Sequence, residues 1–185
     1  MGAGFSMSRT DVSKLLAEIS DAFSWRKRPN LMTTSNELTK HEEDSLLKIF
    51  DLDANDISAD DWENEFDILT LLSPDAFCYY LSSILRVSVK ENELNLIVVF
   101  NLVTMLNRSP NEDWWELSFL ERWSLLTENE LDAIGNWFYW MLDFQSRSIS
   151  DEMIEKTLET LQILKKRKFE QIGRASCRER VSSPV

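Results

Sequence analysis

A segment near the middle of the chain, residues 72–85, constrains the fold more than any other. Ser73 is suited to cap a helix by accepting a hydrogen bond from its first turn, and Pro74 suits the first helical position because it has no N–H to satisfy. Apolar side chains then recur at i, i+3, i+4, i+7 and i+8, namely Phe77, Tyr80, Leu81, Ile84 and Leu85. This spacing predicts a helix that buries one face.

Six further segments show the same apolar period, and several begin with a recognisable cap. Thr39 with Glu42, and Thr127 with Glu130, have the spacing of capping boxes, in which each side chain satisfies a backbone amide near the other. Ser58 has the same position before a third helix. Helices are therefore expected over residues 9–23, from 39, from 58, from 73, over 94–106, from 127 and over 150–168, with a short helical turn around 114–123.

The helical period also predicts which side chains are buried. They are Val12, Leu15, Leu16, Ile19 and Phe23 on the first helix, Leu46, Leu47 and Phe50 on the second, Trp62, Phe66 and Leu69 on the third, Leu131, Ile134, Phe138, Met141 and Leu142 after Thr127, and Ile154, Leu158, Leu161 and Leu164 on the last. Residues 97–100 are also compatible with a buried strand, but the length of their apolar run favours a helix and no partner strand is evident.

These patterns predict an all-α protein, an irregular bundle of about seven helices in a single domain over residues 8–172. The chain of 185 residues has four Gly and four Pro, which is few for an architecture of strands and turns. Residues 173–185 are basic and without an apolar period, and they resemble translated sequencing-adaptor read-through. We expect this tail to be non-native and to lie outside the fold.

The formal net charge is −12, and such an acidic surface disfavours nucleic acid and anionic lipid as partners. It is compatible with a basic protein partner, and also with a charge that serves solubility alone. Two cysteines are too few for a disulfide framework, and no apolar run has the length to span a bilayer. The expected location is the cytoplasm, without a membrane partner.

The sequence offers no strong candidate for catalysis, a metal or a cofactor. His41 is the only histidine and lies among acidic residues in a helix start, where a solvated role is expected. Asp51, Asp53 and Asn55 match three positions of a calcium-binding loop, but Trp62 stands where the loop needs a bidentate carboxylate. Gly-rich phosphate loops and dinucleotide fingerprints are absent. We therefore predict no catalytic residue, no metal and no cofactor.

The tryptophans are the feature with most room for function, because five of the seven lie between residues 114 and 140. Two interpretations are open. Large aromatic side chains usually fill cores, and a helix with aromatic residues on two sides can be buried on both. Alternatively, Trp114, Trp115, Trp140 and Phe144 form an aromatic patch on the surface that binds a partner.

Several of these residues resemble the pattern of an uncharacterised bacterial family, a domain of unknown function with a Leu-Ser-Pro-Glu-Ala-Phe-x-Tyr-Tyr-Leu-Pro motif. Residues 72–82 match it, with Asp75 in place of Glu and Ser82 in place of the last Pro. Weaker matches are Ala22-Phe23, Arg28-Pro29, Trp62 and Leu126-Thr127, so the resemblance spans about residues 15–142. It implies no catalytic residues.

The leading hypothesis is a bacterial, non-enzymatic protein-interaction module that binds a basic protein, in one version an immunity-type protein that neutralises a basic toxin. The alternative is an enzyme or ligand-binding domain that uses carboxylates and tyrosines in a helix-lined pocket, which requires a carboxylate of raised pKa. A third hypothesis is a mimic of nucleic acid, which requires regularly spaced surface carboxylates.

Overall fold

The computed structural model describes residues 9–143 and 149–181, and within them every regular element is helical. The elements are α1 (Arg9–Phe23), α2 (Lys40–Phe50), α3 (Ala59–Asn64), the 3-10 turn η1 (Ile68–Thr70), α4 (Pro74–Lys90), α5 (Ile97–Leu106), the 3-10 turn η2 (Glu112–Trp114), α6 (Leu117–Trp123), α7 (Glu128–Met141) and α8 (Asp151–Val181). The predicted all-α bundle of about seven helices is confirmed, and residues 97–100 are helix rather than strand.

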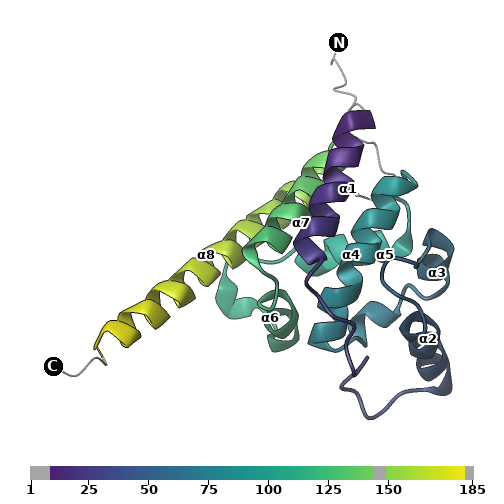
Figure 1. Ribbon diagram of the computed structural model, residues 1–185, viewed down its shortest axis with the longest axis horizontal. Coiled ribbons are helices and arrows are strands. Elements are labelled where there is room, and N and C mark those ends of the chain that lie inside the picture. Colours follow the sequence, from purple (N-terminus) through teal and green to yellow (C-terminus); the bar gives the residue numbers. More distant parts are fainter. Residues whose placement is uncertain (1–8, 144–148, 182–185) are drawn as a thin grey trace.

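α4 lies at the centre of the molecule. It packs against α1, α3, α5 and α6, while α7 lies between α1 and α8 (Figure 1). The predicted buried face of α4 is confirmed, because each of its five apolar residues is at most 1% exposed. Two tryptophans from other helices also fix α4: the indole of Trp62 donates to Ser83 over 3.0 Å, and that of Trp137 donates to Ser88 over 2.9 Å.

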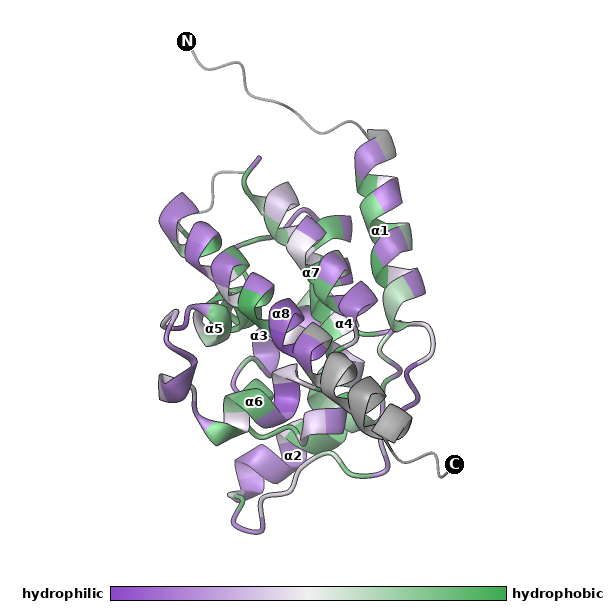
Figure 2. Cartoon of the chain, turned by 90° about the vertical axis from the view of Figure 1, so that its left-hand side faces the viewer, coloured by the Kyte–Doolittle hydropathy of each residue, from purple (hydrophilic) through white to green (hydrophobic). Residues whose placement is uncertain are grey.

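The helix starts follow the local sequence closely. The side chain of Ser73 accepts a hydrogen bond from the amide of Ala76 over 3.2 Å, with Pro74 as the first helical residue. The capping boxes at Thr39 and Thr127 are present, and Ser58 forms a third one with Asp61. Along α1, hydrophilic and hydrophobic residues lie on different sides, as the helical period predicts (Figure 2).

Three predicted helix faces need correction. Leu142, predicted to be buried, lies just after the last residue of α7 and is 37% exposed. On α2 the core side chains are Leu46 and Ile49, whereas Leu47 is 59% exposed, because one residue step rotates it about 100° away from Leu46. The third helix ends at Asn64 instead of continuing through Phe66 to Leu69. It ends there because Glu65 leaves the helical conformation and turns inward, where its carboxylate pairs with Lys48 of α2 at 2.5 Å.

The last helix is longer than predicted. Its expected end lies near Lys168, but α8 continues to Val181 and projects away from the bundle (Figure 1). That the tail over residues 173–185 is non-native stays a prediction. Arg, Ala and Glu are good helix formers and predominate over residues 174–180, and a single Gly173 costs only about 1 kcal/mol inside a helix. Among the described helices, none combines the length and apolar character needed to cross a membrane.

Candidate functional site

The structure describes three of the four aromatic residues of the hypothetical partner-binding patch, and it places them in different environments. Trp114 is 73% exposed, but Trp115 is 6% and Trp140 1% exposed. Phe144 lies outside the described residues. The surface interpretation is therefore wrong for Trp115 and Trp140, which belong to the core.

The burial of these two tryptophans has a clear cause. Because α7 is covered by α1 on one side and by α8 on another, it buries Trp140 as well as Trp137. Trp115 turns inward because its indole N–H donates to the carbonyl of Ser109 over 2.7 Å, and its ring packs edge-on against Phe119 at 5.2 Å.

The aromatic side chain that α7 exposes instead is Tyr139, at 56%, a residue that sequence reasoning missed. The sequence does contain a signal for this exposed position. Asp132, Asn136, Tyr139 and Asp143 are separated by four, three and four positions, which places them on one face of a helix. That face is the one left over once the surrounding tryptophans are assigned to the core.

This face of α7 and the facing side of α1 form what we call the acidic groove. Its lining includes the basic residue Lys14, a few apolar residues, and the polar residues Asp11, Glu18 and Asp21 from α1 with Asp132, Asn136, Tyr139 and Asp143 from α7 and the residues after it. The groove consists of two hollows of about 400 and 290 Å³, and Glu18 and Asn136 line both. The two hollows are therefore neighbours along the seam between the helices.

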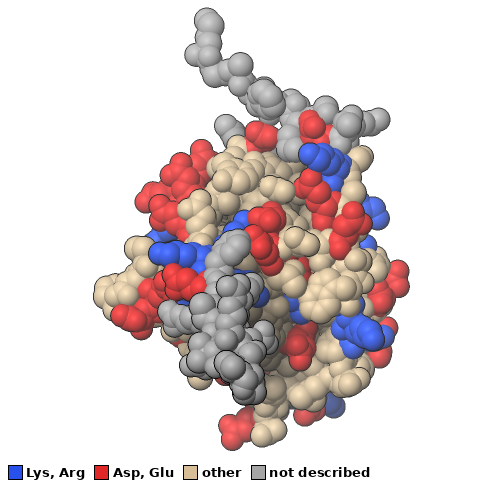
Figure 3. Space-filling view, turned by 60° about the vertical axis from the view of Figure 1, so that its left-hand side comes forward, with Lys and Arg blue, Asp and Glu red and all other residues tan. Residues whose placement is uncertain are grey.

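Within residues 9–143 and 149–181, Lys14 and Lys165 form ion pairs with carboxylates of this groove. The amide of Asn136 donates to Glu18 over 3.1 Å, which ties the two helices together at the middle of the groove. Lys14 lies 3.7 Å from the same carboxylate, and Lys165 of α8 pairs with Asp132. Over the face shown in Figure 3, carboxylates are prominent but form no evenly spaced rows, which does not favour the nucleic-acid mimic.

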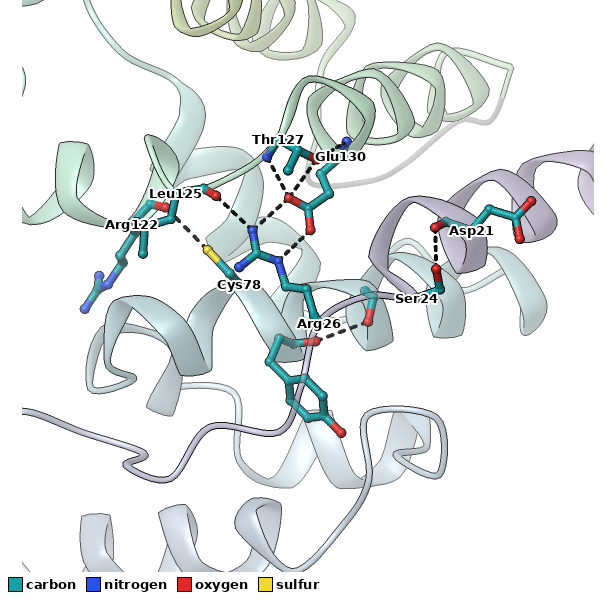
Figure 4. A network of polar contacts seen from close by, with 10 residues as sticks. Asp21, Ser24, Arg26, Cys78, Arg122, Leu125, Thr127 and Glu130 are labelled. Carbon is teal, nitrogen blue, oxygen red and sulfur yellow. Dashed lines mark hydrogen bonds and ion pairs between the residues drawn. The ribbon is translucent and has the colours of Figure 1, made fainter. Parts of the chain in front are cut away.

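A buried ion pair holds the segment after α1 against the start of α7 (Figure 4). The guanidinium of Arg26 contacts Glu130 through Nε at 2.5 Å and Nη2 at 2.7 Å, and it also donates to the carbonyl of Leu125 over 2.9 Å. Glu130 meanwhile accepts from the amide of Thr127 over 2.7 Å. Burial is the largest single influence and disfavours the charged guanidinium, but the hydrogen bond to Glu130 and nearby negative charges together outweigh it and raise the pKa of Arg26.

Cys78 lies close to this ion pair and is a core residue. Its thiol donates to the carbonyl of Arg122 over 3.4 Å (Figure 4). Burial raises the pKa of the thiol to about 12, so it stays protonated and is a poor nucleophile at neutral pH.

A separate cavity, which we call the α1–α4 cavity, lies between α1, α4 and the loop after α2 and has a volume of about 320 Å³. Ile19, Phe23, Asp53, Tyr79 and Arg86 are among its lining residues. The hydroxyl of Tyr79 donates to Asp53 over 2.8 Å. The cavity thus contains a carboxylate and a tyrosine between helices, which are the groups that the enzyme hypothesis names.

The chemistry of this carboxylate does not fit a general acid. Hydrogen bonds from the backbone of Asn55 and from Tyr79 lower the pKa of Asp53, whereas an acid catalyst needs a raised pKa. In the part of the chain that the structure describes, no group of three His, Cys, Asp or Glu side chains is arranged to hold a metal ion. Asp51 and His41 are both exposed.

The lowered pKa of Asp53 predicts a pH-dependent contribution to stability. The folded state favours the carboxylate, so its stabilisation is present above the unfolded pKa of about 3.9 and is lost as the pH falls through the lower folded pKa. We expect Asp53→Asn to destabilise by about 1 kcal/mol at neutral pH, with the difference from wild type shrinking below about pH 4. Urea unfolding across this pH range measures the difference in free energy of unfolding, and Asp51→Asn at an exposed position is the control. A difference that does not change with pH would contradict the prediction.

No protein-family model, curated protein or solved structure matches this chain. The resemblance to the uncharacterised bacterial family stays a prediction from residues 72–82 and their flanking matches. Function must therefore be argued from the geometry of the chain itself.

Proposed function

We propose that this chain is a protein-interaction module of the bacterial cytoplasm that binds a basic protein through the acidic groove. The observation that carries the proposal is Tyr139, an exposed aromatic ring set among carboxylates from α1 and α7. Tyrosine is enriched among the residues that contribute most to binding energy at interfaces. A negative surface also steers a cationic partner toward it and raises the association rate.

The composition also favours a basic protein as the partner. The net charge of −12 acts over the whole surface, while the groove adds a defined place for contact. One concrete version is an immunity-type protein whose groove covers the basic site of a toxin. This version rests on size and charge.

The interaction hypothesis is favoured over the enzyme hypothesis because the α1–α4 cavity and the acidic groove differ in their chemistry. The α1–α4 cavity holds a carboxylate whose pKa is lowered, so it lacks the proton that acid catalysis needs at neutral pH. The acidic groove instead combines an exposed aromatic ring with several exposed carboxylates, which is the composition expected of a polar interface.

A charge-reversal experiment tests the proposal. Candidate partners are the basic proteins encoded beside the gene, and their affinity is measured by calorimetry at increasing salt. We expect Asp21→Lys with Asp143→Lys to weaken binding by about tenfold, because both side chains are exposed at the groove. The matched control, Glu155→Lys with Glu159→Lys on exposed positions of α8, changes the net charge equally. Salt-insensitive binding, or equal losses in both variants, would contradict the groove as the binding surface.

A further inference from the structure

Three charged side chains line the α1–α4 cavity: Arg26, which is already paired with Glu130, and two opposite charges that form no ion pair with each other. Arg86 from α4 and Asp53 from the loop after α2 both line it. Arg86 forms no ion pair with any carboxylate of residues 9–143 and 149–181. The two groups therefore face a shared space without neutralising each other directly.

Arg86 is held in place by backbone carbonyls and by a longer contact of 3.5 Å to the side-chain oxygen of Asn55. Its guanidinium donates to the carbonyl of Ala54 over 2.6 Å and to that of Asn55 over 2.8 Å. The side chain is half-buried, and this burial lowers its pKa, although nearby Asp56 and Asp53 favour the charge. A guanidinium has five N–H donors, so it keeps donors for a carboxylate that enters the cavity.

Asp53 is the complementary anion. Its two oxygens accept hydrogen bonds from the backbone of Asn55 over 2.9 Å and from Tyr79 over 2.8 Å. Each carboxylate oxygen has a second lone pair, so Asp53 can still accept from an ammonium group. The charge of Arg28 also acts on Asp53 but its side chain is not part of the cavity lining.

The remaining wall of the cavity is mixed: Ser20, Ser24 and Ser82 are polar, whereas α1 also contributes an apolar part. Ile19 and Phe23 are both buried side chains of α1 that line it. A volume of about 320 Å³ is at the lower end of the range for ligand pockets, so it admits a small molecule. The apolar part formed by Ile19 and Phe23, beside a separated cation and anion, is complementary to a molecule with two charges and one hydrocarbon group.

We propose that the α1–α4 cavity binds a small zwitterion, an α-amino acid with an apolar side chain. Its carboxylate contacts Arg86, its ammonium group contacts Asp53, and its side chain packs against Ile19 and Phe23. This site is separate from the acidic groove, and the ligand is bound without chemical change. Occupancy neutralises the charge of the half-buried guanidinium, so the ligand stabilises the folded chain.

Thermal unfolding in the presence of each standard amino acid, followed by calorimetry, tests this proposal. We expect an apolar amino acid such as leucine to raise the unfolding temperature and to bind with a dissociation constant below about 1 mM. Two analogues each remove one charge: 4-methylpentanoate lacks the ammonium group, and 3-methylbutylamine lacks the carboxylate. Both should bind at least about tenfold more weakly than leucine. Equal binding by either analogue, or no binding by any amino acid, would overturn the proposal.

A cavity-filling variant locates the site without removing its polar contacts. Ser20 is exposed at the rim of the cavity, so Ser20→Trp is expected to block it and abolish binding. Ser13→Trp places the same side chain at an exposed position two turns earlier on α1, outside the lining, and should leave the dissociation constant unchanged. Undiminished binding by Ser20→Trp would show that the amino acid binds elsewhere and would refute the assignment.

Discussion

Replacing Arg26 with Met is expected to lower the free energy of unfolding by about 3–5 kcal/mol. The cause is Glu130, whose side chain is fully buried and whose charge loses its partner. The loss should be large because Glu130 also completes the cap of α7, so the variant strains the start of a helix that is packed on two sides. Urea unfolding followed by circular dichroism measures the difference.

Two further variants separate a buried charge from lost packing. The double variant Arg26→Met with Glu130→Gln removes both charges, while Gln can still reach back to Thr127 in the capping box. We expect it to recover a substantial part of the stability lost by Arg26→Met alone. Lys14→Met, which breaks the exposed pair with Glu18, should cost less than about 1 kcal/mol. An equal loss of unfolding free energy in Lys14→Met and Arg26→Met would contradict the claim that the buried charge of Glu130 causes the large loss.

Truncation of Trp137 to Ala is the second change with a large expected effect, about 3–5 kcal/mol. The indole has no exposed surface, and its N–H donates to the hydroxyl of Ser88 on the central helix α4. The variant therefore leaves a cavity between α7 and α4 and removes the hydrogen bond that joins them. Chemical unfolding gives the free energy, and Trp114→Ala, at a 73% exposed position, should change it by no more than about 0.5 kcal/mol.

If Trp137→Ala does not fold, Trp137→Phe provides the measurement. Phe keeps most of the apolar volume and loses the N–H, so the expected cost falls to about 1–3 kcal/mol, part of it from the lost hydrogen bond that Ser88 accepts. The Ser88 hydroxyl still donates to the carbonyl of Leu85. A cost for Trp137→Phe no greater than that of Trp114→Ala would contradict the role given to the bond between α7 and α4.

Local signals predicted the fold well because they act within a few residues. The caps at Ser73, Thr39 and Thr127 need only a side chain and an amide three positions away, and the apolar period of α4 reports directly on its buried face. The early end of α3 had no such signal. It depends on the pairing of Glu65 with Lys48, which lie on different elements.

The candidate sites were harder to predict because they join distant segments. The pair between Arg26 and Glu130 spans 104 positions, and nothing in the local sequence of either residue indicates the other. The exposure of the tryptophans was hard to predict for a different reason. Whether Trp140 is exposed depends on α1 and α8 both covering α7, which is a property of the packing and not of the α7 sequence.

The measurement that tests the proposed function most directly compares two exposed aromatic residues in binding the basic partner. Tyr139 lies in the acidic groove, whereas Trp114 lies on η2 outside its lining and is the more exposed of the two. We predict that Tyr139→Ala weakens calorimetric affinity by about 2 kcal/mol and that Trp114→Ala leaves it unchanged. A loss on Trp114→Ala with full affinity in Tyr139→Ala would contradict the acidic groove as the binding surface.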